Sequence, residues 1–198
     1  MKEYILKRVN GQPDWSVIPT LQIDHQRKEN LDNVTAQAQL CWDDEGIFVH
    51  LSCQEKNIRK ELTKKYDPIY EDSCLEFFIR PTDDIHFFNI EFNANCAVFL
   101  GYSKGKPNIV RLILPNHMDT FKPVVNFTDG GWEIFYKLPF ALIQNFFHDF
   151  EPKSGLEFRG NCFKCGDKTE NPHYLMWNPI PEGISFHAPD HFGRMILE

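Results

Sequence analysis

The chain of 198 residues is long enough for one domain that buries its own core, and we expect a single domain over residues 1–198. Its 18 phenylalanines favour strands over helices, because aromatic side chains suit the half-buried faces of a pleated sheet. The net charge of −7 argues against a nucleic acid or an anionic membrane as partner, since both require clustered Lys and Arg. A neutral or weakly polar ligand is the better expectation.

The first residues argue against a targeting segment. Charged side chains interrupt every short apolar run from Met1 to Arg8, so this start fits neither a signal peptide nor a membrane span. As the sequence stands, it predicts a cytoplasmic protein, whereas a leader removed from the chain would make it secreted or periplasmic. The six cysteines fall mostly in predicted strands, and we interpret them as reduced apolar fillers.

Residues 34–55 show the clearest local pattern, that of a β-hairpin. Apolar and polar side chains alternate from Val34 to Trp42 and again from Ile47 to Cys53, which is the period of a strand with one buried face. Between the two runs, Asp43-Asp44-Glu45-Gly46 supplies turn residues. We therefore predict two antiparallel strands joined by a glycine-assisted turn.

Further strand-like runs follow at short intervals, separated by the Gly, Pro, Asn and Asp residues that favour chain reversal. They cover residues 74–80, 86–93, 97–102, 109–114, 123–127, 132–138, 156–164 and 194–197. Only residues 140–147 show the three- and four-residue apolar spacing of a helix. The Pro-rich residues 172–191 predict one long ordered loop. Together these patterns predict an all-β fold, an antiparallel β-sandwich or jelly roll with one short helix.

The most informative segment is Ile69–Ile79, in which one aromatic residue and three acids accompany an apolar strand. Strands are depleted in Asp and Glu, so acids at a strand entrance are expected to hold a turn, bind a cation or accept hydrogen bonds from a polar ligand. A second aromatic segment lies near the C-terminus, where Trp177-Asn178-Pro179 is followed by Phe186-His187-Ala188-Pro189 and Phe192-Gly193.

Along almost the whole chain, short motifs resemble those of the family 9 carbohydrate-binding modules and follow in the family's order. The matching pieces are Asp14-Trp15, the hairpin Ala38–Val49, Glu71–Ile79, Glu91-Phe92-Asn93, Gly131-Trp132 with Leu138-Pro139-Phe140, and Phe192-Gly193 before the last strand. The resemblance implies a β-sandwich that binds a mono- or oligosaccharide without catalysis. Modules of this kind are commonly attached to glycoside hydrolases, which links them to polysaccharide catabolism.

The resemblance also implies a site, in which two aromatic side chains at one end of the sandwich hold the sugar. By position, Tyr70 and Phe186 stand where the family has these platforms, and both offer flat apolar faces for a pyranose. Glu76, with Asn89 or Glu91, would bond the sugar hydroxyls. Burying roughly 100 Å² of apolar surface contributes on the order of 2–3 kcal/mol, so we expect micromolar to millimolar binding.

Calcium is a further expectation, because some members of the resembled family hold structural calcium near the hairpin ends. Carboxylates suit this ion, and the candidate ligands are Asp43, Asp44, Glu55 and Asp72. The sequence contains no fixed calcium loop. No other cofactor is indicated.

Three other interpretations remain open from the residues alone. Asp72, Glu76 and Glu91 offer the paired acids of a glycosidase. Cys162-Phe163-Lys164-Cys165 has the spacing of half a zinc site, which His173, His187 or His191 would complete. Finally, a sandwich of this type that has lost its sugar would mediate contacts with a protein partner, whose identity the sequence leaves unknown.

Overall fold

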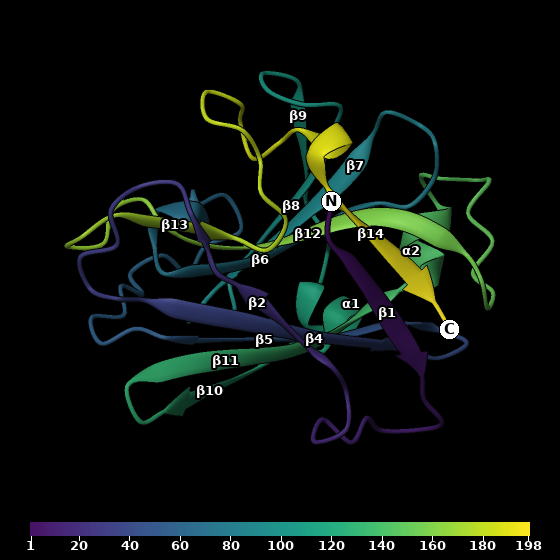
Figure 1. Cartoon of the computed structure of the whole chain (residues 1–198), viewed down its shortest axis with the longest axis horizontal. Helices are drawn as coiled ribbons and strands as arrows, with labels where there is room; N and C mark the ends of the chain where they lie inside the picture. The colour runs from purple at the N-terminus through teal and green to yellow at the C-terminus, as the bar shows by residue number, and fades with distance from the viewer.

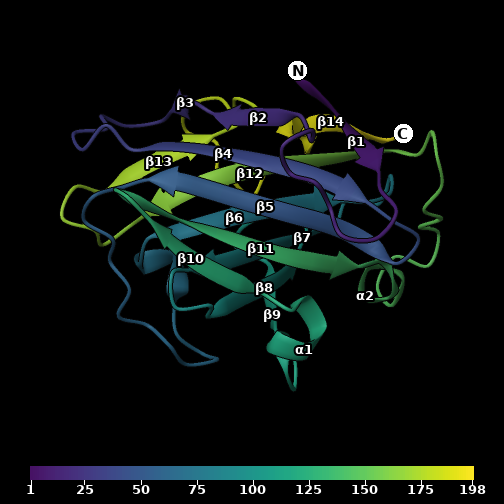
Figure 2. The same ribbon diagram turned by 90° about the horizontal axis from the view of Figure 1, so that it is seen from below.

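The computed structural model describes all residues from 1 to 198 and confirms an all-β fold (Figure 1). Fourteen strands form one continuous curled sheet, and its two halves lie face to face as the layers of a sandwich (Figure 2). The first layer contains β10 (Val124–Thr128), β11 (Gly131–Pro139), β5 (Gly46–Gln54), β4 (Thr35–Trp42) and β2 (Thr20–Ile23). The second layer contains β14 (Gly193–Leu197), β12 (Glu157–Gly166), β6 (Cys74–Arg80), β7 (Phe87–Asn93), β8 (Val98–Ser103), β9 (Ile109–Leu112), β13 (His173–Met176) and β3 (His25–Gln26).

The first strand, β1 (Glu3–Arg8), connects the two layers, which the prediction of a purely antiparallel sandwich did not include. Residues 3–6 pair in parallel with β14, and Lys7 and Arg8 pair in parallel with β4. These partners lie far away in the sequence, and a parallel pair cannot be closed by a short turn. The sheet is therefore mixed, and the first and last strands of the chain lie side by side (Figure 1).

The predicted hairpin is confirmed, with Trp42 opposite Ile47 at its closed end. Gly46 was predicted to assist the turn, but the structure gives it a different role. Asp43 makes the turn by accepting hydrogen bonds from the backbone N–H groups of Glu45 and Gly46. A Cβ at position 46 would lie 2.4 Å from the carbonyl oxygen of Leu138, so Gly46 is required by the close approach of β11.

The other predicted strands are present with shifts of a few residues, but the prediction of one helix and one long loop needs correction. The expected helix is α2 (Phe140–Gln144), and a second helix, α1 (His117–Phe121), begins at the cap Asn116. The segment 172–191 contains β13 and the 3₁₀ turn η2 (Pro189–His191), so it is only partly a loop. Neither helix is long enough, or apolar enough, to cross a membrane.

The main core lies between the layers and contains 37 buried residues. A second cluster of ten buried residues covers the outer face of the second layer, beneath the loop that precedes β14. Strands β6 and β7 are consequently buried on both faces, and their outward-facing side chains, such as Cys74 and Phe78, belong to the second cluster. This doubly covered part of the sheet forms the floor of the candidate site.

Candidate functional site

A cavity of about 500 Å³ opens over the outer face of the second layer. Residues from distant parts of the chain line it: Tyr70 from the 3₁₀ turn η1 (Ile69–Glu71), Phe99 from β8, Tyr174 from β13 and Phe186 from the loop before η2. Glu76 and Glu91 line it as well. Four of the five predicted ligand-binding residues therefore meet in one cavity of a size suited to a small ligand.

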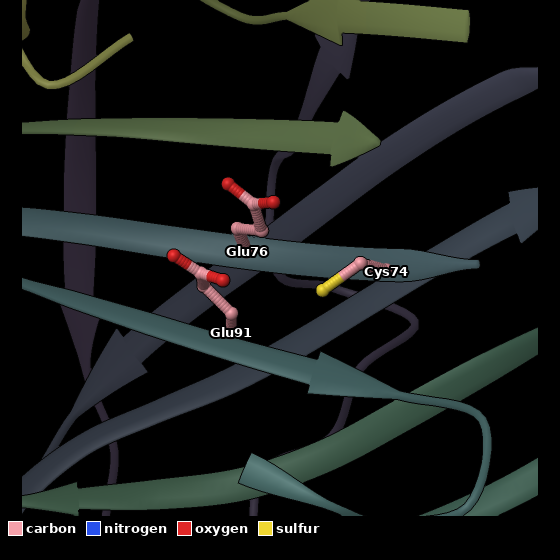
Figure 3. Close-up of side chains that lie close together, drawn as sticks. All are labelled: Cys74, Glu76 and Glu91. Atoms are coloured by element: carbon pink, nitrogen blue, oxygen red, sulfur yellow. The ribbon is translucent and has the colours of Figure 1, made fainter. Parts of the chain in front are cut away.

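The floor of the cavity carries two carboxylates side by side. Glu76 on β6 pairs directly with Glu91 on β7, and each is only 3% exposed. Figure 3 shows the two acids on neighbouring strands, close to Cys74. Neither carboxylate forms an ion pair, and Oε2 of Glu91 has no hydrogen-bond partner. A buried acceptor without a partner is costly, so this floor is suited to a ligand that donates hydrogen bonds.

Burial and mutual repulsion favour the protonated forms of these acids. Burial raises the pKa of Glu91 to about 7. Burial, with the charge of Glu91 as the next cause, raises the pKa of Glu76 well above its ordinary value. Near neutral pH the pair therefore retains protons that exposed glutamates would lose, which lets it both donate and accept hydrogen bonds.

Asn89, the fifth predicted contact, does not line the cavity. It is fully buried, and its Nδ2 donates a hydrogen bond of 2.7 Å to Oε1 of Glu91. On the neighbouring strand, a Cβ at Gly101 would lie 2.0 Å from Oδ1 of Asn89, so the missing side chain gives Asn89 its space. Asn89 thus positions Glu91 from two residues away on the same strand.

The two predicted aromatic platforms differ in accessibility. Tyr70 is 37% exposed and stands edge-on to Phe99, with 6.2 Å between the ring centroids. Phe186 stacks on the fully buried Phe163 at 4.6 Å, and the guanidinium carbon of Arg27 lies 4.4 Å from its centroid. Since Arg27 also lines the cavity, a ligand on this side meets an arginine stacked on Phe186 as well as the ring itself.

The four predicted calcium ligands lie apart and already have partners. Asp43 pairs with Lys137 at 2.8 Å, and Asp44 pairs with Arg8, both at the hairpin turn. Calcium binding there stays a prediction that requires these pairs to open.

The other two predicted calcium ligands are buried beside cations of the protein itself. Glu55 lies 3.2 Å from the ammonium of Lys164 and accepts a hydrogen bond from Ser73. Asp72 lies 3.3 Å from Arg59, and its Oδ2 accepts hydrogen bonds from backbone N–H groups. A calcium ion at either place would have to displace a lysine or an arginine.

One group of potential metal ligands does lie together, and it consists of Cys74, Glu76 and Glu91, whose ligand atoms fall within 4.8 Å of one another (Figure 3). Burial raises the pKa of the Cys74 thiol well above its ordinary value. A protonated thiol is a poor metal ligand, because metals bind the thiolate. Two carboxylates alone are few for calcium, which takes six to eight oxygen ligands.

The zinc interpretation of the C-x-x-C motif is wrong for a geometric reason. Cys162 and Cys165 are three residues apart on strand β12, so their side chains point to opposite faces of the sheet. Cys162 lies in the main core, whereas Cys165 belongs to the outer cluster beneath the cavity. All six cysteines are free, and five of them are buried.

The histidines do not restore a zinc site either. Nε2 of His173 lies 2.8 Å from the buried ammonium of Lys164, on the core side of the sheet. His187 lines the cavity, but the one close group of three potential metal ligands is Cys74, Glu76 and Glu91, which contains no histidine.

The predicted acids also lack the arrangement that a glycosidase requires. Asp72 is fully buried beside Arg59 and does not line the cavity. Glu76 and Glu91 stand together on one floor, whereas a glycosidase places its two carboxyls on either side of the scissile bond.

Several lining residues carried no signal in the sequence. Arg27 and Lys28 follow the two-residue strand β3, Lys106 lies in the β8–β9 turn, and Asp167 follows β12. Each belongs to a turn whose position depends on long-range pairing.

A second cavity, of about 490 Å³, lies on the first layer. Trp15, Phe48 and Phe135 line it together with Lys137. The ring of Trp15 lies 5.3 Å from that of His50 and 5.7 Å from that of Phe135. Unlike the first cavity, this one has no pair of buried acids without a counter-charge.

The fold and the first cavity define a β-sandwich with a cavity on one outer face. The model of carbohydrate-binding family 9 matches residues 18–197, so the chain belongs to this family. Its modules are non-catalytic binding domains. No curated protein matches the sequence.

Solved structures confirm the fold over the whole chain. A protein from Bacteroides uniformis, titled a "putative carbohydrate-binding protein", has 22% identity and a TM-score of 0.84, with 100% of this chain and 99% of that chain covered. A family 9 module from Caldicellulosiruptor kristjanssonii was solved in complex with glucose, and this structure has 12% identity and a TM-score of 0.69. The same kind of module was solved in complex with cellotriose, with 11% identity and a TM-score of 0.70. These two comparisons cover 100% of this chain and 96% and 94% of the module.

Proposed function

We propose that the chain binds a mono- or oligosaccharide end in the first cavity, without transforming it. The observation that carries this proposal is the unpaired carboxyl pair, Glu76 and Glu91, at the floor of a cavity with aromatic walls. Sugar hydroxyls both donate and accept hydrogen bonds, so one of them can supply the partner that Oε2 of Glu91 lacks, and the apolar C–H face of a pyranose suits an aromatic ring. The family and its glucose-bound and cellotriose-bound member support the same ligand class.

Tyr70 is the side chain that we assign to the C–H face of the sugar. Its ring is partly exposed at the cavity wall and is held from behind by Phe99. The Arg27–Phe186 stack lines the same cavity. The ligand is then enclosed by amphipathic groups and hydrogen-bonded from below, in line with a role beside enzymes of polysaccharide breakdown.

The direct test is calorimetric titration of the Tyr70→Ala variant with saccharides selected by a thermal-shift screen of the unaltered protein. Removing the ring should weaken binding about tenfold, which corresponds to about 1.4 kcal/mol. Phe127→Ala is the matched control, because Phe127 is exposed on β10 and does not line the cavity. Equal affinity of the two variants for the saccharide would show that Tyr70 does not contact it. A thermal-shift screen without any saccharide response would contradict the proposed function.

A further inference from the structure

The same cavity contains basic side chains that have no acidic partner. Arg27, Lys28 and Lys106 line it, and none of them takes part in any ion pair of the molecule. This grouping stands out in a chain with a net charge of −7. Most other basic residues are paired with nearby acids, as in the pairs of Lys137 and of Arg194.

Arg27 is held in a defined position. Its guanidinium lies 4.4 Å from the centroid of Phe186, and its Nη2 faces the carbonyl oxygens of Ile180 and Pro181 at 3.2 and 3.4 Å. Its remaining N–H groups have no partner within the protein. An arginine fixed in this way can present a planar pair of donors to an anionic group.

Lys28, the residue after Arg27, and Lys106 from another turn extend the basic wall. The ammonium of Lys28 lies 4.9 Å from the centroid of Tyr174. Lys106 lies in the β8–β9 turn, near enough that its charge affects the ionisation of both Glu91 and Asp167. The wall is therefore built from two separate segments, residues 27–28 and the β8–β9 turn, that line one cavity.

The acids of the floor and the cations of the wall share a cavity without pairing with one another. Elsewhere the protein pairs its buried acids internally, since Glu55 lies 3.2 Å from Lys164 and Asp72 lies 3.3 Å from Arg59. In the cavity, Glu76 and Glu91 form no ion pair, and Arg27, Lys28 and Lys106 form none either, although the acid Asp167 lines the same space. A ligand with donors at one end and a negative group at the other would complement both sets.

We propose that the saccharide bound in this cavity is acidic, with its hydroxyls on Glu76 and Glu91 and its carboxylate on Arg27 and Lys106. The chemical class is a uronic acid or an oligosaccharide that ends in one. This inference rests on the proposed function, and it adds the charge of the ligand. The raised pKa values of the floor acids support it, because the protonated forms repel an anion less.

The test compares matched ligands that differ only in the acidic group. Methyl glucuronide is titrated beside methyl glucoside, and methyl galacturonide beside methyl galactoside. At least one uronide should bind about tenfold more tightly than its neutral partner, and added salt should reduce this difference. Equal or tighter binding of the neutral sugars would overturn the inference while leaving the saccharide function intact, whereas no binding of any of the four would overturn both.

Two variants and one anion complete the experiment. Lys106→Gln should lower the ratio of uronide to neutral-sugar affinity about fivefold, because it removes one charge-assisted contact. Lys104→Gln is the matched control from the same turn, since Lys104 is exposed and does not line the cavity. An unchanged ratio in Lys106→Gln, or inorganic phosphate binding as tightly as the uronide, would contradict the inference.

Discussion

At the scale of single residues, the buried acids of this protein fall into two kinds. Glu55 and Asp72 lie beside cations and hold the fold together. Glu76 and Glu91 lie beside each other, with no cation, at the floor of a cavity. Burying an acid without a partner disfavours its charged form, so the second pair lowers stability wherever it must ionise. Such an arrangement is typical of residues kept for binding rather than for folding.

This cost predicts a pH dependence that belongs to Glu91. Its pKa rises from 4.5 to about 7 on folding because of burial, so between these values the folded state holds a proton that the unfolded state has released. The contribution of Glu91 to stability must then fall as pH rises from about 4.5 through 7. The Glu91→Gln variant lacks this titration. Its free energy of unfolding, relative to that of the unaltered protein, should therefore increase by on the order of 2 kcal/mol between pH 5 and pH 8.

Urea unfolding of both proteins at several pH values measures this difference. Other groups titrate in the same range, and neutral His187 has the opposite effect, since its pKa is lowered to about 4 by burial. The effects of groups that do not interact with Glu91 cancel to first order when the two proteins are compared at each pH. Glu76, whose pKa the charge of Glu91 raises, adds to the difference with the same sign. A difference that stays constant from pH 5 to pH 8 would mean that Glu91 ionises as an exposed glutamate does.

At the scale of elements, one buried ion pair joins strands of the two layers. Lys164 comes from β12 in the second layer, and Glu55 follows β5 in the first. His173 from β13 lies 2.8 Å from the same ammonium, and Trp132 of β11 donates a hydrogen bond to Glu55. The lysine occupies the position beside Glu55 where a metal ion was expected from the sequence.

Removing Lys164 should therefore be costly. In Lys164→Met the carboxylate of Glu55 stays buried without its counter-charge, which should lower the free energy of unfolding by about 3–5 kcal/mol. Urea unfolding measures this loss. The double variant Lys164→Met with Glu55→Gln should recover much of the lost stability. If Lys164→Met alone were as stable as the unaltered protein, the ion pair would not contribute to stability.

The elements differ in how well the sequence predicted them. The hairpin at residues 34–55 was predictable because its alternation and its turn are local. Strand β1 was missed, although Tyr4 and Leu6 alternate with exposed residues, because its partners are β4 and β14, far away in the sequence. Helix α1 has only five residues, too few for a visible helical period.

The candidate site shows the same division between local and long-range information. Tyr70, Glu76, Glu91 and Phe186 were placed by the motifs of the family, and the cavity brings all four together. The basic wall was not predicted, because Arg27, Lys28 and Lys106 meet only through the folded sheet. Motif position also could not reveal that Arg27 stacks on Phe186, since this contact joins residues 159 positions apart.

At the scale of the whole molecule, the sandwich leaves two cavities of similar size on opposite layers. Both have aromatic walls, so shape alone does not decide which one holds a saccharide. The first has a floor of unpaired acids and a wall of unpaired cations, whereas the acid Asp43 and the lysine Lys137 in the second pair with each other. Polar groups without a partner are what a polar ligand complements, which supports our proposal that the saccharide binds in the first cavity.

The most direct measurement is a titration of ¹⁵N-labelled protein with neutral and acidic monosaccharides, followed by two-dimensional NMR. Our account predicts that the largest shifts arise at the backbone amides of Tyr70, Glu76, Glu91 and Phe186, together with the indirectly coupled Asn89. The indole signal of Trp15 should stay unchanged. Shifts concentrated at Trp15 and Phe48 would place the ligand in the second cavity and contradict the central claim.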